Sequence, residues 1–526
     1  MLFTTTTTTL LPPFLYLFVF VCLSSSAFTQ RVAAKNNMIR CIERERLALL
    51  DFKQGLVDDY GLLSSWGSDE CCNWWGVHCN NSTGHVTKLD LHAHLDDYGD
   101  PVEQLSAHKV SPSLLALKHL NYLDLSYNDF QGNRFPEFIG SFKRLRVLRI
   151  MNTRFAGTIP PQLGNLTNLR VLNIYEDYFN LNLKIKNLEW LSLLSSLRSF
   201  YLTGVDIDLI ESSKSSVTLP PFLEELRLSL CKLHGSLPFS LNSSSPFLSV
   251  DFSYNYMSTS SVFHLLRNAS KKLTSIDLSG NYFADTIPDH AFGDMEFLKS
   301  LYLDSIITDR IPKSFWNLTH LRILSMCDNQ LNESIAELFP KLLKDAGKSL
   351  QILDLSGSKF TGELPADINT RFTSLRELRA TNNQLNGSNF RLPSSLARLN
   401  YLDVLDLSNN FLSGKIPSGT QLQSFNASSY AENIGLCGDP LSKCSAYIPP
   451  QNKNNDFQEG DNFLDRGFYI SMVLGFSLCF WGIVVTLMLK DSWRIAYYEF
   501  LNDVKDWLYV RMKIYLVRTQ RKLRRI

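Results

Sequence analysis

The segment Leu120-Asn-Tyr-Leu-Asp-Leu-Ser-Tyr-Asn128 recurs along the chain in altered copies. The clearest copies are Ile276-Asp-Leu-Ser-Gly-Asn281, Leu353-Asp-Leu-Ser-Gly-Ser358 and Leu402-Asp-Val-Leu-Asp-Leu-Ser-Asn-Asn410. Aligning the first residue of each Leu-x-Leu pair, or its substitute, places thirteen units at 89, 123, 148, 172, 200, 226, 250, 276, 301, 324, 353, 378 and 405. The first spacing is 34 residues, which marks an insertion, and the others are 23 to 29.

A period near 25 residues with this motif indicates a leucine-rich repeat, and we expect an α/β solenoid over residues 89–425. Each unit supplies one short strand whose alternating leucines point inward, and neighbours must stack to bury them. The recurring Asn can bond backbone groups where each strand turns away, at 128, 255, 281, 329, 383 and 410. Cys231 occupies the same position, so we interpret it as a small buried substitute and not as a reactive thiol.

A second signature follows the strand, as in Phe155-Ala-Gly-Thr-Ile-Pro160 and Leu412-Ser-Gly-Lys-Ile-Pro417. Glycine permits a tight turn there, and proline suits either a first helical turn or extended backbone. This element resembles the plant-specific subclass of leucine-rich repeats. Thirteen strands spaced by about 4.8 Å would form an inner arc of about 60 Å, which suits a macromolecule better than a small substrate.

The composition excludes several classes of protein. The chain has 526 residues, with 52 Lys and Arg against 51 Asp and Glu, so it lacks the excess basic charge of a nucleic-acid-binding surface. There is no Gly-rich phosphate loop and no Gly-x-Ser-x-Gly nucleophile motif. We therefore predict a protein that is not an enzyme, needs no cofactor and does not bind nucleic acid.

Residues 1–27 look like a secretory signal peptide. An apolar run from Leu10 to Leu23 is followed by Ser25 and Ala27, small residues that suit cleavage after Ala27. The run is interrupted by prolines, and no Lys or Arg precedes it. The alternative is an uncleaved anchor.

Residues 467–489 form an uncharged apolar segment of 23 residues, long enough for a transmembrane helix. The tail 490–526 carries ten Lys or Arg against four acids, whereas the juxtamembrane linker 445–466 carries four acids against two bases. Since positive residues stay in the cytoplasm, this asymmetry predicts a single-pass type I protein of the plasma membrane with its N-terminus outside. A buried core helix is the alternative. The basic tail is expected to rest on anionic membrane lipid.

Potential N-glycosylation sites agree with this topology. Nine asparagines begin Asn-x-Ser/Thr sequons, and none follows the apolar segment: Asn80, Asn81, Asn165, Asn242, Asn268, Asn317, Asn332, Asn386 and Asn426.

Two cysteine groups flank the repeats. Residues 28–88 hold an amphipathic segment (Leu47, Leu49, Leu50 and Phe52) and the cysteines Cys41, Cys71, Cys72 and Cys79; residues 426–444 hold Cys437 and Cys444. Solenoid ends need covering, and disulfides in a secreted chain can hold short caps. Four N-terminal cysteines allow three connectivities, and a zinc site is the rival interpretation.

Together these parts resemble the plant leucine-rich-repeat receptor-like proteins of the disease-resistance type. The shared features are the Cys-Cys-x-Trp-x-Gly-Val-x-Cys cap, the run 419–425, the run 435–441, and one span with a short basic tail. The resemblance implies the disulfides Cys41–Cys71, Cys72–Cys79 and Cys437–Cys444. It also implies no kinase domain, an extracellular protein, peptide or glycan ligand derived from a pathogen or the plant wall, and signalling in plant defence through a partner receptor kinase.

Two departures from the family stand out. Members often have twice as many repeats, with a non-repeat island before the last four, whereas this array is short and shows no island. Three alternatives stay open: an inhibitor of microbial wall-degrading enzymes, a receptor for a developmental peptide, and a shortened decoy that does not signal.

The strand residue between each inward pair should face the concave side. Asp is the usual residue there, so the departures from it are the candidate ligand contacts: Arg149, Tyr201, Arg227, Tyr302 and Arg379. Tyr and Arg also dominate interface hot spots. Ordinary surface variation is the alternative.

In the apolar segment, Ser471, Gly475 and Cys479 are spaced by four, a stripe of small residues that would let a partner helix approach. A plain membrane anchor is the alternative. Three histidines lie close together near three acids and could bind a metal: His85, His92 and His94 with Asp90, Asp96 and Asp97. A solvated first strand and the loop insertion after it are the favoured interpretation. We assign no metal site from the sequence.

Overall fold

The computed structural model describes residues 40–444, except 97–100, 108, 178–181, 208–216, 236, 238, 241–245, 258–260, 270–271, 284–285, 308–309, 343–346 and 387–391. The predicted signal peptide, juxtamembrane linker, apolar segment with Ser471, Gly475 and Cys479, and basic tail all lie outside the described residues. Among the helices that are described, none has the length and apolar character needed to cross a membrane.

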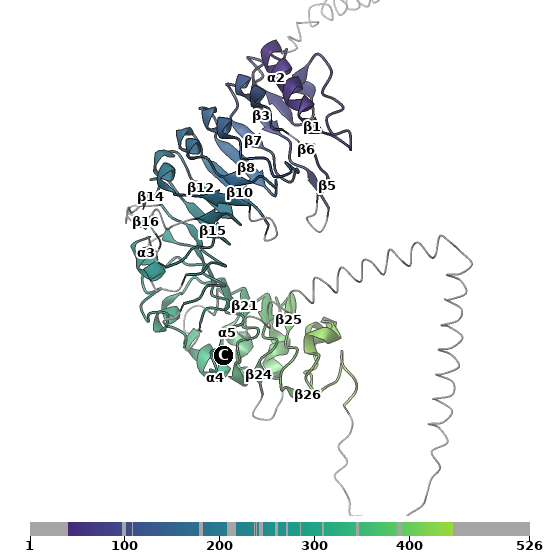
Figure 1. Cartoon of the computed structure of the whole chain (residues 1–526). Coiled ribbons are helices and arrows are strands. Elements are labelled where there is room, and N and C mark those ends of the chain that lie inside the picture. Colours follow the sequence, from purple (N-terminus) through teal and green to yellow (C-terminus); the bar gives the residue numbers. More distant parts are fainter. Residues whose placement is uncertain are drawn as a thin grey trace, which may run out of the picture. The chain divides into compact units, whose positions relative to one another are not determined.

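One sheet of fourteen strands organises the array. Its strands, in order, are β2 (Val77–Cys79), β3 (Val86–Asp90), β7 (Tyr122–Asp124), β8 (Val147–Met151), β10 (Val171–Tyr175), β12 (Ser199–Thr203), β15 (Glu225–Ser229), β17 (Ser249–Asp251), β18 (Ser275–Asp277), β19 (Ser300–Tyr302), β20 (Ile323–Ser325), β21 (Ile352–Asp354), β23 (Glu377–Arg379) and β25 (Val404–Asp406). β2 runs antiparallel to β3, and from β3 onward every neighbouring pair is parallel. Figure 1 shows these strands along the inner side of a curved array.

The aligned residues of the thirteen units pair directly with one another across neighbouring strands. Leu89 pairs with Leu123, which pairs with Leu148, and the register continues unbroken to Leu405. The thirteen side chains are at most 2% exposed. Full burial of an aliphatic side chain stabilises a fold by about 1.5–3 kcal/mol, so this stack contributes strongly to stability. The solenoid of leucine-rich repeats is confirmed.

Short helices and strands form the rest of each repeat. The α-helices are α2 (Glu43–Gln54), α3 (Ser261–Ala269), α4 (Ile335–Leu342), α5 (Ile368–Arg371) and α6 (Thr420–Ser424). The 3-10 helices are Cys71–Asn73, Pro112–Ala116, Glu137–Ser141, Pro161–Asn165, Glu189–Leu193, Lys313–Asn317, Ser394–Arg398 and Ala427–Tyr430. In Figure 1, α3 and α4 lie on the outer side of the array, away from the main sheet.

Six small sheets accompany the main one. Their strands are β1 (Leu56–Val57) with β6 (Ser106–Ala107); β4 (His94–Leu95) with β5 (Pro101–Glu103); β9 (Gly157–Thr158), β11 (Leu183–Ile185) and β13 (Asp206–Ile207); β14 (Val217–Thr218) with β16 (Phe239–Ser240); β22 (Thr361–Gly362) with β24 (Gln384–Leu385); and β26 (Ser413–Lys415) with β27 (Gly435–Cys437). The second signature builds several of them. Gly157, at φ 85°, makes the turn into β9, and Pro160 is extended just before a 3-10 helix.

Buried asparagines bond backbone groups at the turns after the strands, as expected, and they also join consecutive repeats. Asn255 is typical: its Oδ1 accepts from the Cys231 and Leu233 backbone N–H groups, both at 3.0 Å, and its Nδ2 donates to the Leu228 carbonyl at 2.7 Å. Cys231 is fully buried, and burial raises the pKa of its thiol to about 12. It therefore packs as a small apolar residue and is not a thiolate, as the sequence predicted.

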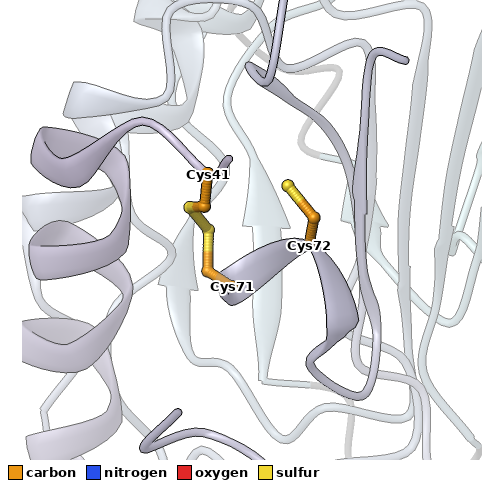
Figure 2. A group of neighbouring side chains, drawn as sticks. All are labelled: Cys41, Cys71 and Cys72. Carbon is orange, nitrogen blue, oxygen red and sulfur yellow. A yellow bond between two sulfur atoms is a disulfide. The ribbon is translucent and has the colours of Figure 1, made fainter. Parts of the chain in front are cut away.

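Both ends of the array carry disulfides. Cys41 is bonded to Cys71 and Cys72 to Cys79, the pairs that the family resemblance implies. Figure 2 shows the Cys41–Cys71 bond between the start of α2 and the 3-10 helix Cys71–Asn73. The rival zinc site is wrong, because all four sulfurs are held in disulfides. At the C-terminal end of the array, the Cys437–Cys444 disulfide links the last residue of β27 to the segment that follows it.

The amphipathic face of α2 differs from the expectation at one position. Leu49 and Phe52 are buried, but Leu47 is 53% exposed and Glu45 is buried in the cap. The Glu45 carboxylate accepts from the Val86 backbone N–H at 2.7 Å and contacts the His85 Nδ1 atom at 2.8 Å. These two bonds satisfy the buried carboxylate and explain why an acidic residue is tolerated there.

Seven of the nine sequon asparagines are described and exposed: Asn80, Asn81, Asn165, Asn317, Asn332, Asn386 and Asn426. Asn242 and the side chain of Asn268 lie outside the description. Glycosylation at all nine stays a prediction.

Candidate ligand-binding surface

On the open face of the main sheet, side chains at the same position of successive strands form rows across the sheet. Because side chains alternate along a strand, residues two apart share a face. The row at the centre of the strands runs Arg149, Asn173, Tyr201, Arg227, Asp251, Asp277, Tyr302, Ser325, Asp354, Arg379 and Asp406, each paired in register with the next. Flanking residues two positions earlier or later, such as Glu225 and Tyr175, widen this surface.

A hollow of about 400 Å³ lies on this face between β8 and β17. Its lining includes Met151, Asn173, Tyr175, Tyr201, Glu225 and Arg227. The lining combines aromatic rings, one thioether and charges of both signs, which is the composition of a surface that recognises a ligand by shape and by a few polar contacts.

Neighbouring side chains hold Arg227 in place. Its Nε lies 2.8 Å from the Asp251 Oδ2 atom, and its guanidinium carbon lies 5.7 Å from the centre of the Tyr201 ring. The Tyr201 hydroxyl donates to the Glu225 carboxylate. The Arg227 side chain is still 54% exposed, so it is oriented by its neighbours and remains accessible to a ligand. A positioned arginine loses less side-chain entropy on binding than a free one.

A second cationic cluster lies toward the N-terminus of the array. Arg149 donates to the Tyr122 hydroxyl at 3.4 Å and lies 3.9 Å from the Asp124 carboxylate. Lys88 lies 4.4 Å from the centre of the Tyr122 ring. Burial, followed by the charges of Asp124 and Asp90, raises the pKa of Tyr122 to about 12, so this phenol stays protonated.

An acidic stretch follows the hollow toward the C-terminus. Burial, and then the negative charge of Asp251, raises the pKa of Asp277 to about 6. Burial also raises the pKa of Asp304, while hydrogen bonds from Ser325 and Cys327 oppose that shift. Tyr302 lies in register with Asp277 on the next strand, and its pKa is raised by burial and by Asp277 and Asp304. The face is therefore acidic next to Tyr302, between the hollow and Arg379.

Comparisons with known proteins identify the class of the chain. Residues 42–80 match the family described as Leucine rich repeat N-terminal domain, and residues 271–331 match the family described as Leucine rich repeat. Residues 119–142, 349–370 and 401–422 match a further Leucine Rich Repeat family. Receptor-like protein EIX1 of Solanum lycopersicum is 40% identical over 366 residues, which cover 67% of this chain and 34% of that protein. The chain belongs to the plant leucine-rich-repeat receptor-like proteins.

Other comparisons place this receptor-like protein among longer relatives. Receptor-like protein Cf-9 of Solanum pimpinellifolium is 32% identical over 337 residues, which cover 59% of this chain and 33% of that protein. The chain thus spans about a third of the length of the curated relatives it matches. A solved structure, "Plant peptide hormone receptor RGFR1 in complex with RGF2", aligns with 66% of this chain and 58% of that chain, at 23% identity and a TM-score of 0.45.

The five candidate contacts of this receptor-like protein do not form a single cluster. Tyr201 and Arg227 are in register on adjacent strands and both line the hollow. Arg149 lies two strands before Tyr201, whereas Tyr302 lies three strands beyond Arg227 and Arg379 three strands further. Arg379 is paired with Glu377 and lies 3.7 Å from the Asp354 carboxylate.

Other residues that line the hollow were not predicted from the sequence, among them Met151, Tyr175 and Glu225. Strand alternation could have found them, since each lies two residues from a central position and so shares its face.

Proposed function

We propose that this chain is a plant cell-surface receptor-like protein that binds an extracellular ligand on the open face of its repeats and signals through a partner receptor kinase in defence. The observation that carries the ligand-binding role is the hollow around Tyr201 and Arg227, with its exposed arginine held by Asp251 and Tyr201. Similarity to plant receptor-like proteins supports the receptor role.

The extent of the face favours a macromolecular ligand, namely a protein, peptide or glycan, and the similarity to plant receptor-like proteins suggests an origin in a pathogen or the plant wall. The hollow is one part of a surface about 60 Å long. A ligand that places a carboxylate or another hydrogen-bond acceptor on Arg227 and an apolar or sugar face on Tyr175 would use both kinds of group in the lining.

Alanine in place of Arg227 is expected to weaken binding about 30-fold, because a hot-spot arginine contributes about 2 kcal/mol or more. Tyr201→Ala should have an effect of similar size, since it removes the ring beside the guanidinium. The measurement is binding of full-length protein to an immobilised panel of secreted microbial proteins and wall glycans, repeated with each variant on whatever the native protein binds.

Arg376→Ala is the matched control, because Arg376 is an exposed arginine whose ion pair with Asp403 lies away from the hollow. Binding that is unchanged in both Arg227→Ala and Tyr201→Ala, or that falls equally in Arg376→Ala, would contradict this placement of the ligand.

The proposed coupling to a kinase lies in the apolar segment 467–489. Gly475→Leu should reduce the partner kinase that co-purifies from plant membranes by about fivefold, because the larger side chain blocks close approach of another helix. Ser477→Leu is the control, since a helix places position 477 on the opposite face from Gly475. Equal recovery of kinase with both variants would refute the role of the stripe, and no kinase with the native protein would refute the receptor mechanism.

A further inference from the structure

We propose that Asp90, His92 and Asp124 form a binding site for a divalent transition-metal ion of the zinc class. Two of the three residues lie on adjacent strands at the N-terminal end of the array, and the third follows the first of these strands. Asp90 on β3 is paired in register with Asp124 on β7, so their carboxylates are neighbours on one face. His92 is two residues after Asp90 and lies on the same side of the chain.

The potential ligand atoms are already gathered. The His92 Nδ1 atom lies 2.5 Å from the Asp90 Oδ1 atom, and one ligand atom from each of the three residues lies within 4.8 Å of the others. Zinc holds nitrogen and oxygen ligands at about 2.0–2.2 Å, so ligand atoms around it lie within about 4 Å of one another. His92 is exposed, so its ring has room to turn toward a bound ion.

The donor set selects the class of metal. One imidazole nitrogen and two carboxylate oxygens suit zinc and its neighbours, whereas calcium and magnesium prefer sites made of oxygen alone. Three protein ligands leave at least one coordination position open, and His92 lies at the exposed side of the group. A bound ion would therefore have a free coordination position for a further ligand at the open face of the first repeats.

Surrounding groups orient the two carboxylates. Asp124 Oδ1 accepts from the Ser126 backbone N–H at 3.0 Å, and Asp124 Oδ2 accepts from the Tyr122 hydroxyl at 3.1 Å. Lys88 contacts Asp90 through Oδ2 at 2.9 Å, so it leaves Oδ1 facing His92. Such second contacts fix the direction of metal ligands.

The same neighbours limit the affinity. The Lys88 ammonium and the Arg149 guanidinium, which lies 3.9 Å from Asp124, repel a divalent cation. Because of this repulsion, removal of Lys88 should strengthen metal binding. A cluster with a purely structural role would show no such effect. The site differs from the hollow at Tyr201 and Arg227, and its occupation does not require the ligand proposed for that hollow.

The experiment is calorimetric titration of ZnCl₂ into the metal-free full-length protein, with the visible absorption of added Co²⁺ as a second signal. We expect one site in the native protein, binding at least about tenfold weaker in His92→Ala and in Asp90→Asn, and binding several-fold tighter in Lys88→Ala. His78→Ala is the matched control, because His78 is an exposed histidine on the neighbouring strand β2, and its affinity should stay unchanged.

Asp90→Asn keeps the size of the side chain, and the thermal unfolding midpoint of each variant verifies that it is folded. Three outcomes would overturn the proposal: no zinc binding by the native protein, equal affinity in native protein and both ligand variants, or a loss in His78→Ala as large as in His92→Ala. Each would mean that the cluster is only a network of hydrogen bonds and ion pairs.

Discussion

Alanine in place of Asn255 is expected to lower the free energy of unfolding by about 3–5 kcal/mol. The side chain is 1% exposed and bonds five backbone groups: the N–H groups of Cys231 and Leu233 and the carbonyls of Leu228, Phe252 and Ser253. Alanine would leave several of these buried groups without partners, and each unsatisfied group costs about 1–3 kcal/mol. Relaxation of the turn recovers part of this loss.

Urea unfolding followed by circular dichroism measures the effect. Asn168→Ala is the matched control, because the exposed Asn168 side chain makes a hydrogen bond, 2.8 Å long, to the Lys143 carbonyl at the surface. We expect that variant to change the unfolding free energy by less than about 0.5 kcal/mol. Similar losses in the two variants would show that the buried bonds between repeats contribute nothing special to stability.

Unfolding of the native protein should become easier as the pH rises from about 4.5 to about 7, and Glu176→Gln should remove this part of the dependence. Glu176 is fully buried; its Oε1 accepts from the Thr153 backbone N–H at 3.2 Å and from the Thr153 hydroxyl at 3.0 Å. Among the described residues, its Oε2 has no partner. Burial raises the pKa of Glu176 to about 7, against the opposing hydrogen bonds of Thr153 and Arg154.

The direction of this pH dependence follows from the difference in proton binding between the folded and the unfolded protein. Between the two pKa values the folded protein keeps a proton on Glu176, whereas the unfolded chain, whose carboxyl has an ordinary pKa near 4.5, releases it. The stabilisation is therefore complete below pH 4.5 and lost as the pH passes 7. A shift of this size corresponds to about 3 kcal/mol.

Thermal unfolding midpoints of the native protein and of Glu176→Gln, measured at pH 5 and pH 8, test this pH dependence. Relative to the native protein, Glu176→Gln should be about equally stable at pH 5 and clearly more stable at pH 8, because glutamine stays uncharged. A constant difference between the two proteins at both pH values would contradict the assignment of the raised pKa to Glu176.

Much of the fold followed from local sequence patterns. The Leu-x-Leu pairs repeat with a nearly constant period, and a repeat that cannot bury its apolar face alone is covered when similar repeats stack on it. The asparagine position was equally predictable, because the residue that bonds backbone at each turn has a constant offset from the strand. Cys231 was read correctly for the same reason.

Departures from the repeat pattern were not predictable. By alignment Asp177 occupies the asparagine position of its unit, yet the residue before it, Glu176, turns inward and bonds Thr153. The grouping of His85 with His92 also failed, since His85 contacts Glu45 of the cap and stacks on His119 with ring centres 3.8 Å apart. In both places the contact joins residues more than 20 positions apart, which a local pattern does not contain.

The sequence by itself determined the repeat architecture, the strand register and the face on which candidate contacts lie, because each depends on spacing within one unit. Only the tertiary structure decided which contacts meet. It set the Tyr201 ring beside the Arg227 guanidinium, and it brought the side chain of His92 to the Asp90 and Asp124 carboxylates. Such contacts depend on the directions of the side chains and on the charges carried by neighbouring repeats. These directions and charges vary from unit to unit, whereas the leucines that build the fold do not.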